Sequence, residues 1–300
     1  MRTLRTVAAA CLAAGLLTAC TSTGSTGGAS DNKPGGAAAA SGSAAAGGSA
    51  GATGSAAPGS AAQGGAAKPA PKEALLASAA VMEKAGSAKV TVTPGDGNGS
   101  GGTGEYVWKN PPSFLLNTEI DGQQGKILFV ADAMYLGAPA ELATLAGGKN
   151  WMKLDPRDAV TGVPGSTDIV PFATMMQLMD PGVQLVAAAP TATLVGPETV
   201  AGQATVHYRS EVQVDTLVGA MKLTPELKTK VNAQLKASGA SAVTDYWINA
   251  KGELVQQSST DLATTKTDKP STVVYSALGT VQATKAPSAS EVFNLGDILK

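Results

Sequence analysis

The sequence predicts an α+β fold built around a curved antiparallel β-sheet. After residue 72, most of the chain consists of short runs in which apolar and polar residues alternate, bounded by Gly, Pro, Asn or Asp. A few longer stretches instead repeat apolar residues at helical spacing. The strand-like runs follow one another directly and do not alternate regularly with helices, so a doubly wound parallel fold is rejected.

Helical spacing occurs in separate parts of the chain. Helices are expected over 71–85, 166–179, 181–188 and 224–237, with a short terminal helix near 290–299. The clearest is 224–237, because Thr224 can cap its start and Pro225 suits the first helical position.

Strands are expected between these helices. They cover 88–93, 104–108, 113–120, 126–130, 133–137, 151–154, 191–200, 203–214, 242–249, 253–262 and 272–278. The clearest is 203–214, in which Val206 and Tyr208 share one face while His207 and Arg209 share the other. We therefore expect the first face to be buried and the second to be wet, with His207 on the surface.

The first twenty residues predict export. Arg2 and Arg5 form a basic start, and residues 7–17 form an apolar run, far shorter than the ~20 residues that span a bilayer. Small residues then lead to Cys20. This order is typical of a secretory signal and not of a transmembrane helix.

The signal ends in a motif that resembles the bacterial lipobox, formed by Leu17, Thr18, Ala19 and Cys20. The resemblance implies cleavage before Cys20 and a diacylglyceryl thioether on its sulfur, with two or three acyl chains of the palmitate type. Two chains make membrane attachment stable, whereas one is marginal. The implied location is the outer, extracytoplasmic face of the cell membrane. The alternative is an ordinary signal peptide with an incidental cysteine.

The chain is expected to divide into three parts. Residues 1–19 are a lipoprotein signal peptide, 20–71 are the lipidated N-terminus with an Ala/Gly/Ser-rich tether, and 72–300 form a single α+β domain. In 21–71, 42 of 51 residues are Ala, Gly, Ser or Thr, and none is Val, Ile, Leu, Met or aromatic. Such a segment cannot bury enough apolar surface to offset the entropy of ordering. We expect a disordered tether with a root-mean-square reach of roughly 40 Å.

Composition argues against several function classes. Without Arg2 and Arg5, the chain has 20 basic and 23 acidic residues, and no basic cluster with interleaved aromatics occurs. Nucleic-acid binding is therefore not expected. Cys11 lies in the signal and Cys20 would carry lipid, which leaves no thiol for a disulfide or a cysteine metal site. His207 is the only histidine, and we expect no catalytic residue, metal or cofactor.

One group of residues is a candidate ligand-binding surface. Phe172, Met175, Met176 and Met179 lie together on the predicted helix 166–179. Methionine surfaces are flexible and polarizable and adapt to varied ligands, so these residues are candidates for the wall of a hydrophobic cavity. The alternative, which the sequence alone favours, is that they pack the helix onto the sheet as ordinary core.

Several motifs occur in a characteristic order. They are the lipobox, the tether, Met82-Glu83-Lys84-Ala85-Gly86, Gly202 with Thr205-Val206-His207-Tyr208, and Asp245-Tyr246-Trp247-Ile248-Asn249 turning through Lys251-Gly252 into Leu254-Val255. This combination resembles the LppX/LprG-type lipoproteins of actinobacteria, which share the half-barrel fold of the periplasmic carriers LolA and LolB. The resemblance covers most of 72–300. It implies helices packed on the concave face of the sheet, an apolar cavity between them, and an acylated lipid or lipoglycan as ligand.

The sequence thus favours a membrane-anchored envelope lipoprotein, monomeric, that binds or carries a lipid or another hydrophobic ligand between sheet and helices. The alternative is a non-catalytic envelope scaffold or adaptor that binds a protein partner. A hydrolase is a third hypothesis, for which the sequence offers no catalytic residues.

Overall fold

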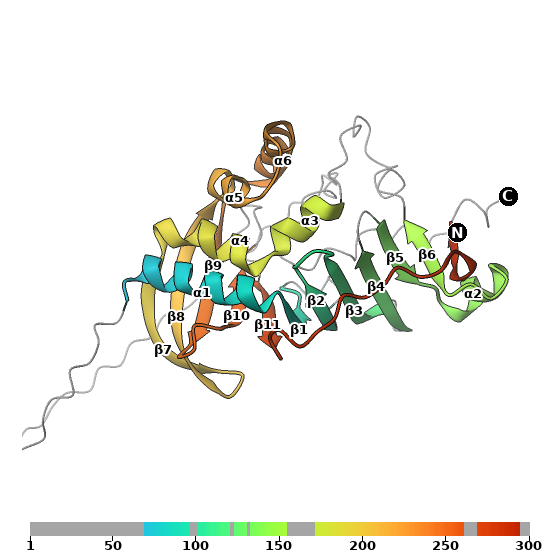
Figure 1. Cartoon of the computed structure of the whole chain (residues 1–300), viewed down its shortest axis with the longest axis horizontal. Helices are drawn as coiled ribbons and strands as arrows, with labels where there is room; N and C mark the ends of the chain where they lie inside the picture. Colours follow the sequence, from blue (N-terminus) through green and yellow to red (C-terminus); the bar gives the residue numbers. More distant parts are fainter. Residues whose placement is uncertain are drawn as a thin grey trace, which may run out of the picture. The chain divides into compact units, whose positions relative to one another are not determined.

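The computed structural model describes residues 69–95, 101–120, 123–130, 133–154, 172–260 and 269–294. All of them belong to one compact unit of the chain, drawn in colour in Figure 1. The predicted signal peptide, Cys20 and almost all of the predicted tether lie outside the described residues.

Twelve strands form one open sheet in the order β12-β6-β5-β4-β3-β2-β1-β11-β10-β9-β8-β7. The strands are β1 Ser87–Thr93, β2 Gly102–Val107, β3 Ser113–Ile120, β4 Gln123–Val130, β5 Ala133–Gly137, β6 Trp151–Leu154, β7 Thr193–Val200, β8 Gln203–Gln213, β9 Ser241–Asn249, β10 Leu254–Ser259, β11 Ser271–Ser276 and β12 Val292–Asn294. Neighbouring strands are antiparallel except β12 and β6, which are parallel.

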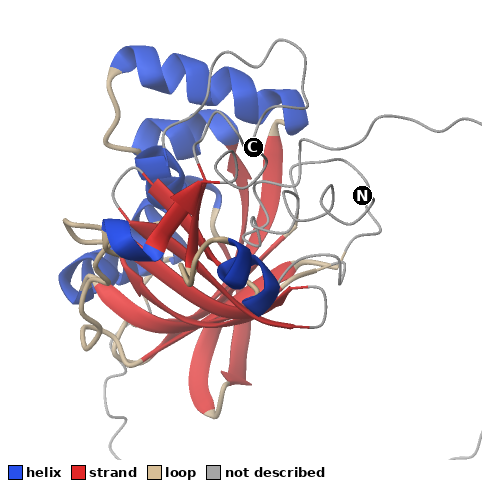
Figure 2. Cartoon of the chain, turned by 90° about the vertical axis from the view of Figure 1, so that its right-hand side faces the viewer, coloured by secondary structure: helices blue, strands red, loops and turns tan. Residues whose placement is uncertain are grey.

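The helices gather mainly on the concave face of this sheet (Figures 1 and 2). They are α1 Pro71–Ala85, α2 Ala140–Leu145, α3 Phe172–Met179, α4 Pro181–Ala188, α5 Val214–Ala220 and α6 Pro225–Ser238, with 3-10 turns η3 Ala189–Thr191 and η4 Ala289–Glu291. The predicted fold class, an α+β half-barrel with helices on its concave face, is confirmed. Among the described residues, no helix is both long and apolar enough to cross a membrane.

Helix α1 begins and ends where the sequence predicts. Pro71 opens it, and Gly86 ends it in the left-handed conformation, with φ 69°, while its N–H donates to the carbonyl of Met82. The indole Nε1 of Trp108 donates to the same carbonyl oxygen at 2.9 Å. Leu75 and Met82 are fully buried against the sheet. The end of α1 is therefore fixed to the loop that follows β2.

Strand β1 joins the two halves of the sheet. Val90 faces Gly104 of β2 on one side and Tyr275 of β11 on the other. Gly104 is required by close packing, since a Cβ there would lie 2.2 Å from the carbonyl oxygen of Leu115 on β3. The first strand of the domain therefore obtains its second neighbouring strand only from residues near the end of the described chain.

A row of register partners forms the apolar inner face across β1 to β5. The row is Ala88, Tyr106, Phe114, Phe129 and Met134, and every member is buried. The ring centroids of Tyr106 and Phe114 are 5.6 Å apart in an edge-to-face arrangement.

The segment after β11 crosses the outer face of the sheet (dark red in Figure 1). The amide of Val281 donates to the hydroxyl oxygen of Ser87 at 3.2 Å, and that of Thr284 donates to the hydroxyl oxygen of Ser113 at 3.0 Å. Both serines are buried although they point away from the helices. We call residues 277–291 the strap. It ends in β12, which adds a short edge to the sheet.

Three expectations need correction. The terminal helix near 290–299 is wrong over its described part: a single 3-10 turn is followed by β12, because Phe293 is buried when it pairs beside Met152 of β6. Helices α2 and α5 were not expected, and Val214 opens α5 instead of closing the strand before it. The other described elements agree with their expected ranges to within a few residues, and residues 166–171 of the expected helix 166–179 lie outside the described residues.

Edge strand β7 is irregular. Its register against β8 shifts between Leu194 and Gly196, and Pro197 follows at once. Proline is tolerated in edge strands, where its missing N–H faces solvent.

Candidate functional site

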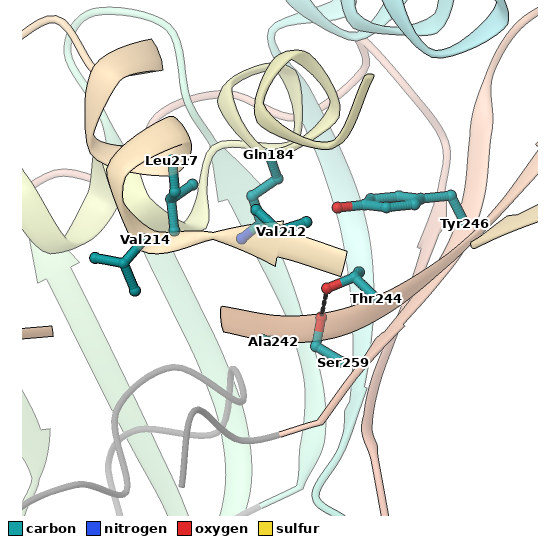
Figure 3. Close-up of a pocket in the computed structure, with 8 residues that line it drawn as sticks. All are labelled: Gln184, Val212, Val214, Leu217, Ala242, Thr244, Tyr246 and Ser259. Atoms are coloured by element: carbon teal, nitrogen blue, oxygen red, sulfur yellow. Dashed lines mark hydrogen bonds between the residues drawn. The ribbon is translucent and has the colours of Figure 1, made fainter. Parts of the chain in front are cut away.

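The interior between the helices and the sheet contains a small pocket. It has a volume of about 20 Å³. Its lining residues come from α4, α5 and strands β8 to β10: Gln184, Val212, Val214, Leu217, Ala242, Thr244, Tyr246 and Ser259 (Figure 3). The volume suffices for about one water molecule.

The pocket has an apolar part and a polar part. Val214 and Leu217 lie on one side in Figure 3, Val212 and Gln184 lie in the middle, and the Tyr246 hydroxyl points toward this middle part from the other side. Thr244 and Ser259 hydrogen-bond to each other at 2.8 Å between their side-chain oxygens. The Gln184 amide donates to the carbonyl of Leu178 at 2.7 Å, which fixes its orientation. The lining therefore suits a mostly apolar group with a hydrogen-bonding end.

Three buried tyrosines face this interior. Burial raises the pKa of Tyr246, Tyr275 and Tyr106 well above the ordinary tyrosine value. All three therefore keep their phenolic protons at neutral pH and can donate hydrogen bonds. Tyr106 donates to the carbonyl of Met176 at 2.8 Å and so attaches α3 to β2.

Two buried polar atoms in the interior lack a hydrogen-bond partner among the described residues. They are Oγ of Ser78 on α1 and Oε1 of Gln257 on β10. Ser78 is fully buried between Leu75 and Met82, on the face of α1 that packs on the sheet. Gln257 lies directly opposite the pocket residue Tyr246, so it faces the same interior. Unpartnered polar atoms are rare in a fully packed core, because each one loses its hydration without compensation.

The predicted cavity residues lie on α3. The side chain of Met176 is buried in the core, while Met175 and Met179 are partly buried and pack against it. Phe172 opens the same helix. The pocket itself is lined by other residues, none of which the sequence had singled out as candidates. One signal was present in the sequence, namely the polar run from Gln256 to Ser259 inside an expected strand.

Asp180 connects α3 to α4. Its carboxylate accepts from the amides of Gly182 at 2.8 Å and Val183 at 3.4 Å, which caps α4. Burial raises the pKa of Asp180, and this outweighs the lowering by its two backbone donors.

His207 does not lie on a wet surface, and this expectation was wrong. Its exposed fraction is 8%, because the Trp247 ring on β9 stacks on the imidazole with centroids 4.4 Å apart. Nε2 of His207 lies 2.7 Å from Oδ1 of Asp245, and Nδ1 lies 3.3 Å from Oε2 of Glu198. Arg209 is exposed, as expected, and holds both Asp245 oxygens at 2.8 and 3.1 Å.

This outer-face cluster ties three strands together. Trp247 donates from Nε1 to the same Glu198 oxygen at 2.7 Å, so residues of β7, β8 and β9 share one network. In the part of the chain that the structure describes, no group of three His, Cys, Asp or Glu side chains is arranged to hold a metal ion. The expectation that the chain is not an enzyme stays a prediction.

In fold, the chain is similar to solved structures of mycobacterial lipoproteins and of a LolA superfamily protein. LprF from Mycobacterium bovis is 12% identical, with 73% of this chain and 97% of LprF aligned at a TM-score of 0.46. The lipoprotein LppX of Mycobacterium tuberculosis is 13% identical over 71% of this chain and 99% of LppX, at a TM-score of 0.41. A LolA superfamily protein from Nitrosomonas europaea is 8% identical over 73% of this chain and 96% of its own, at a TM-score of 0.23.

In sequence, the chain is similar to an uncharacterized 31.2 kDa protein from the rplA-rplJ intergenic region of Streptomyces griseus. The two are 28% identical over 175 residues, 57% of each chain. The chain thus spans little more than half the length of this relative. No family model matches the chain.

Replacing Ser78 with Ala should stabilise the protein, because it removes a buried hydroxyl without a partner. We expect the free energy of unfolding, measured by urea denaturation, to rise by about 1 kcal/mol. The matched control is Ser258→Ala, since the Ser258 hydroxyl lies 3.1 Å from that of Thr272. Ser258→Ala should lower stability, and a loss of stability in Ser78→Ala would show that Ser78 does have a partner.

Asp180→Asn should make stability less dependent on pH. Because the folded-state pKa of Asp180 is raised, the folded protein binds its proton more tightly than the unfolded chain. This group therefore stabilises the wild type below its ordinary pKa, and the stabilisation is lost as pH rises through the raised value. Unfolding experiments at pH values from below the ordinary pKa of Asp180 to above its raised pKa should show the wild type losing stability relative to Asp180→Asn as the pH rises. Asp180→Ala should cost about 1 kcal/mol more than Asn, because it also removes the helix cap.

Proposed function

We propose that this chain is an envelope lipoprotein that binds or carries a lipid or another hydrophobic ligand between its sheet and its helices. In this proposal residues 1–19 are removed as a signal peptide, Cys20 carries the acyl chains, 20–71 form the tether and 72–300 form the ligand-binding domain. The protein lies at the outer face of the cell membrane and performs no catalysis.

The observation that carries the proposal is the incomplete polar pairing inside the domain. Ser78 Oγ and Gln257 Oε1 come from opposite walls of the interior, one from α1 and the other from β10. Each costs free energy while it remains unpartnered, of the order of 1–3 kcal/mol. A ligand with an amide or hydroxyl group next to its acyl chain could donate to Gln257 Oε1 and pair with the Ser78 hydroxyl, and part of the affinity would come from this pairing.

For an acyl chain to enter this pocket, the helices that line it must move away from the sheet. The pocket of about 20 Å³ is far smaller than the ~300–1,000 Å³ usual for small-molecule sites. Helices α1 and α4 are suited to such movement because half of their buried positions carry Ala or Ser. These are Ala74, Ser78, Ala79, Ala187 and Ala188, out of five buried positions on each helix. Small side chains bury less apolar area than Leu or Phe, so separating these helices costs less.

The methionines of α3 would complete the apolar wall. Met175 and Met179 are partly buried at the margin of the core, and their flexible side chains can repack around an entering chain. The same helix is attached to β2 by the hydrogen bond from Tyr106 to Met176. We expect α4, not α3, to move most when ligand binds.

Cys20→Ser should release the protein from the membrane. We expect the wild type in the membrane fraction, with a mature mass increased by the diacylglyceryl group, and Cys20→Ser in the soluble fraction. Cys11→Ser is the matched control and should behave as wild type, since Cys11 belongs to the predicted signal peptide. Membrane retention of Cys20→Ser would contradict the anchor.

The Cys20→Ser protein also permits a direct test of ligand binding. Purified without detergent, it should release lipid that mass spectrometry detects, and it should bind a fluorescent fatty acid saturably. Met179→Glu should weaken this binding about tenfold, because it places a charge in the apolar wall. Leu145→Glu, at an exposed position on α2, is the control and should bind as before. Empty extracts together with non-saturable probe binding would reject the carrier and favour the scaffold or adaptor alternative.

A further inference from the structure

Most of the large apolar side chains that are exposed in the described part of the chain lie on three neighbouring elements. Six large apolar side chains are exposed among the described residues: Leu76 39%, Leu145 72%, Val186 43%, Leu194 53%, Val195 53% and Val243 38%. Leu76, Val186, Leu194 and Val195 belong to α1, α4 and β7, and we call these four residues the apolar end. Leu145 and Val243 lie on other elements, α2 and β9.

The elements of the apolar end are neighbours. Helices α1 and α4 pack closely, since a Cβ at Gly182 would lie 3.7 Å from the carbonyl oxygen of Ala79. Helix α1 also contacts η3 and β7. Figure 1 shows the first turns of α1, the last turn of α4 and β7 at the same side of the domain.

Charged residues in these elements are confined to the two ends of α1, with Lys72, Glu73, Glu83 and Lys84, and to Glu198 late in β7. Between Asp180 and Glu198 the chain has no Lys, Arg, Asp or Glu, and between Glu73 and Glu83 it has none either. Lys, Arg, Asp and Glu make up 15% of the whole chain. A surface of this kind on a water-soluble domain indicates an interaction site, because charges are normally interspersed on free surfaces.

We propose that the apolar end docks on the surface of the lipid bilayer to which the chain is anchored. This rests on the anchoring of Cys20 under the proposed function. The point where the tether joins the domain indicates which partner covers the apolar end. The described chain begins at Pro69, just before α1 begins at Pro71, so the tether leads into the same helix that carries Leu76. Bilayer lipid is therefore the partner held nearest to the apolar end.

The tether allows a weak contact to be effective. Attachment through a flexible linker gives an effective concentration of the order of millimolar, so even a contact of millimolar affinity would be substantially occupied. Insertion of partly exposed Leu and Val side chains at the headgroup boundary supplies affinity of this kind. Because the apolar end has no basic cluster, docking should be insensitive to salt and should not need anionic lipid.

The test uses the lipidated full-length mature chain in phosphatidylcholine vesicles, with an environment-sensitive dye on a single introduced cysteine. Cys20 is blocked by its lipid, so Leu194→Cys carries the only free thiol. The dye at residue 194 should gain about threefold in emission on vesicle binding, and spin-labelled lipid should quench it. The matched control is Leu145→Cys, whose exposed side chain lies on α2 and whose dye should not respond. Adding Val186→Glu to Leu194→Cys should remove most of the gain, while 0.5 M salt should not.

The outcomes separate docking from its alternatives. No response at residue 194, or an equal response at 194 and 145, would overturn the proposal. A response that depends on protein concentration and occurs without vesicles would show that a second copy of the chain covers this end, and would also overturn it. Co-sedimentation with vesicles is measured in the same samples. If the chain sediments with vesicles but the dye at residue 194 does not respond, the docking proposal is wrong and the proposed anchor is not contradicted. If wild-type protein from cells carries no lipid on Cys20, the proposed anchor itself is wrong.

Discussion

The pairing of β1 with β11 determines how the rest of the domain is arranged. Residues near the start and the end of the described chain meet there, and the Ser276 hydroxyl donates to the carbonyl of Lys89 across 187 positions of sequence. This pairing joins a local meander, β2 to β6, to a second group of strands, β7 to β11, in one curved sheet. Helix α1 directly precedes β1, so the same pairing places it on the concave face. The interior between helices and sheet exists only because of this long-range contact.

The two faces of the sheet are stabilised in different ways. The concave face is apolar and covered by helices with many small side chains, and among the described residues two buried polar atoms between sheet and helices lack a partner. The convex face is fixed by specific polar contacts, through the strap over β1 to β3 and through the cluster of His207 with Asp245 and Glu198 over β7 to β9. A sheet stiffened from outside can keep its curvature while the helix layer inside moves, which suits the proposed carrier function.

Local patterns in the sequence predicted most elements because their signals are local. Proline and glycine bounded α1, and Thr224 accepts from the amide of Leu227 at 3.4 Å as the cap of α6. The errors arose where a distant residue decides the outcome. His207 is covered by Trp247 from another strand, which alternation within its own strand cannot reveal. Val292 to Asn294 form a strand only because β6 is beside them. The pocket residues escaped prediction for the same reason, since they come from five separate elements.

The irregular edge of the sheet has a consequence under the proposed attachment of Cys20 to the membrane. Anchored chains are confined to two dimensions, where a long flat edge strand would promote edge-to-edge aggregation between copies. Strand β7 has a register shift after Leu194 and then Pro197, which offers no N–H to an added strand. At the opposite edge, β12 has only three residues. Both edges are therefore poor templates for β-sheet extension, and copies anchored as proposed would not polymerise through their sheets when crowded on a bilayer.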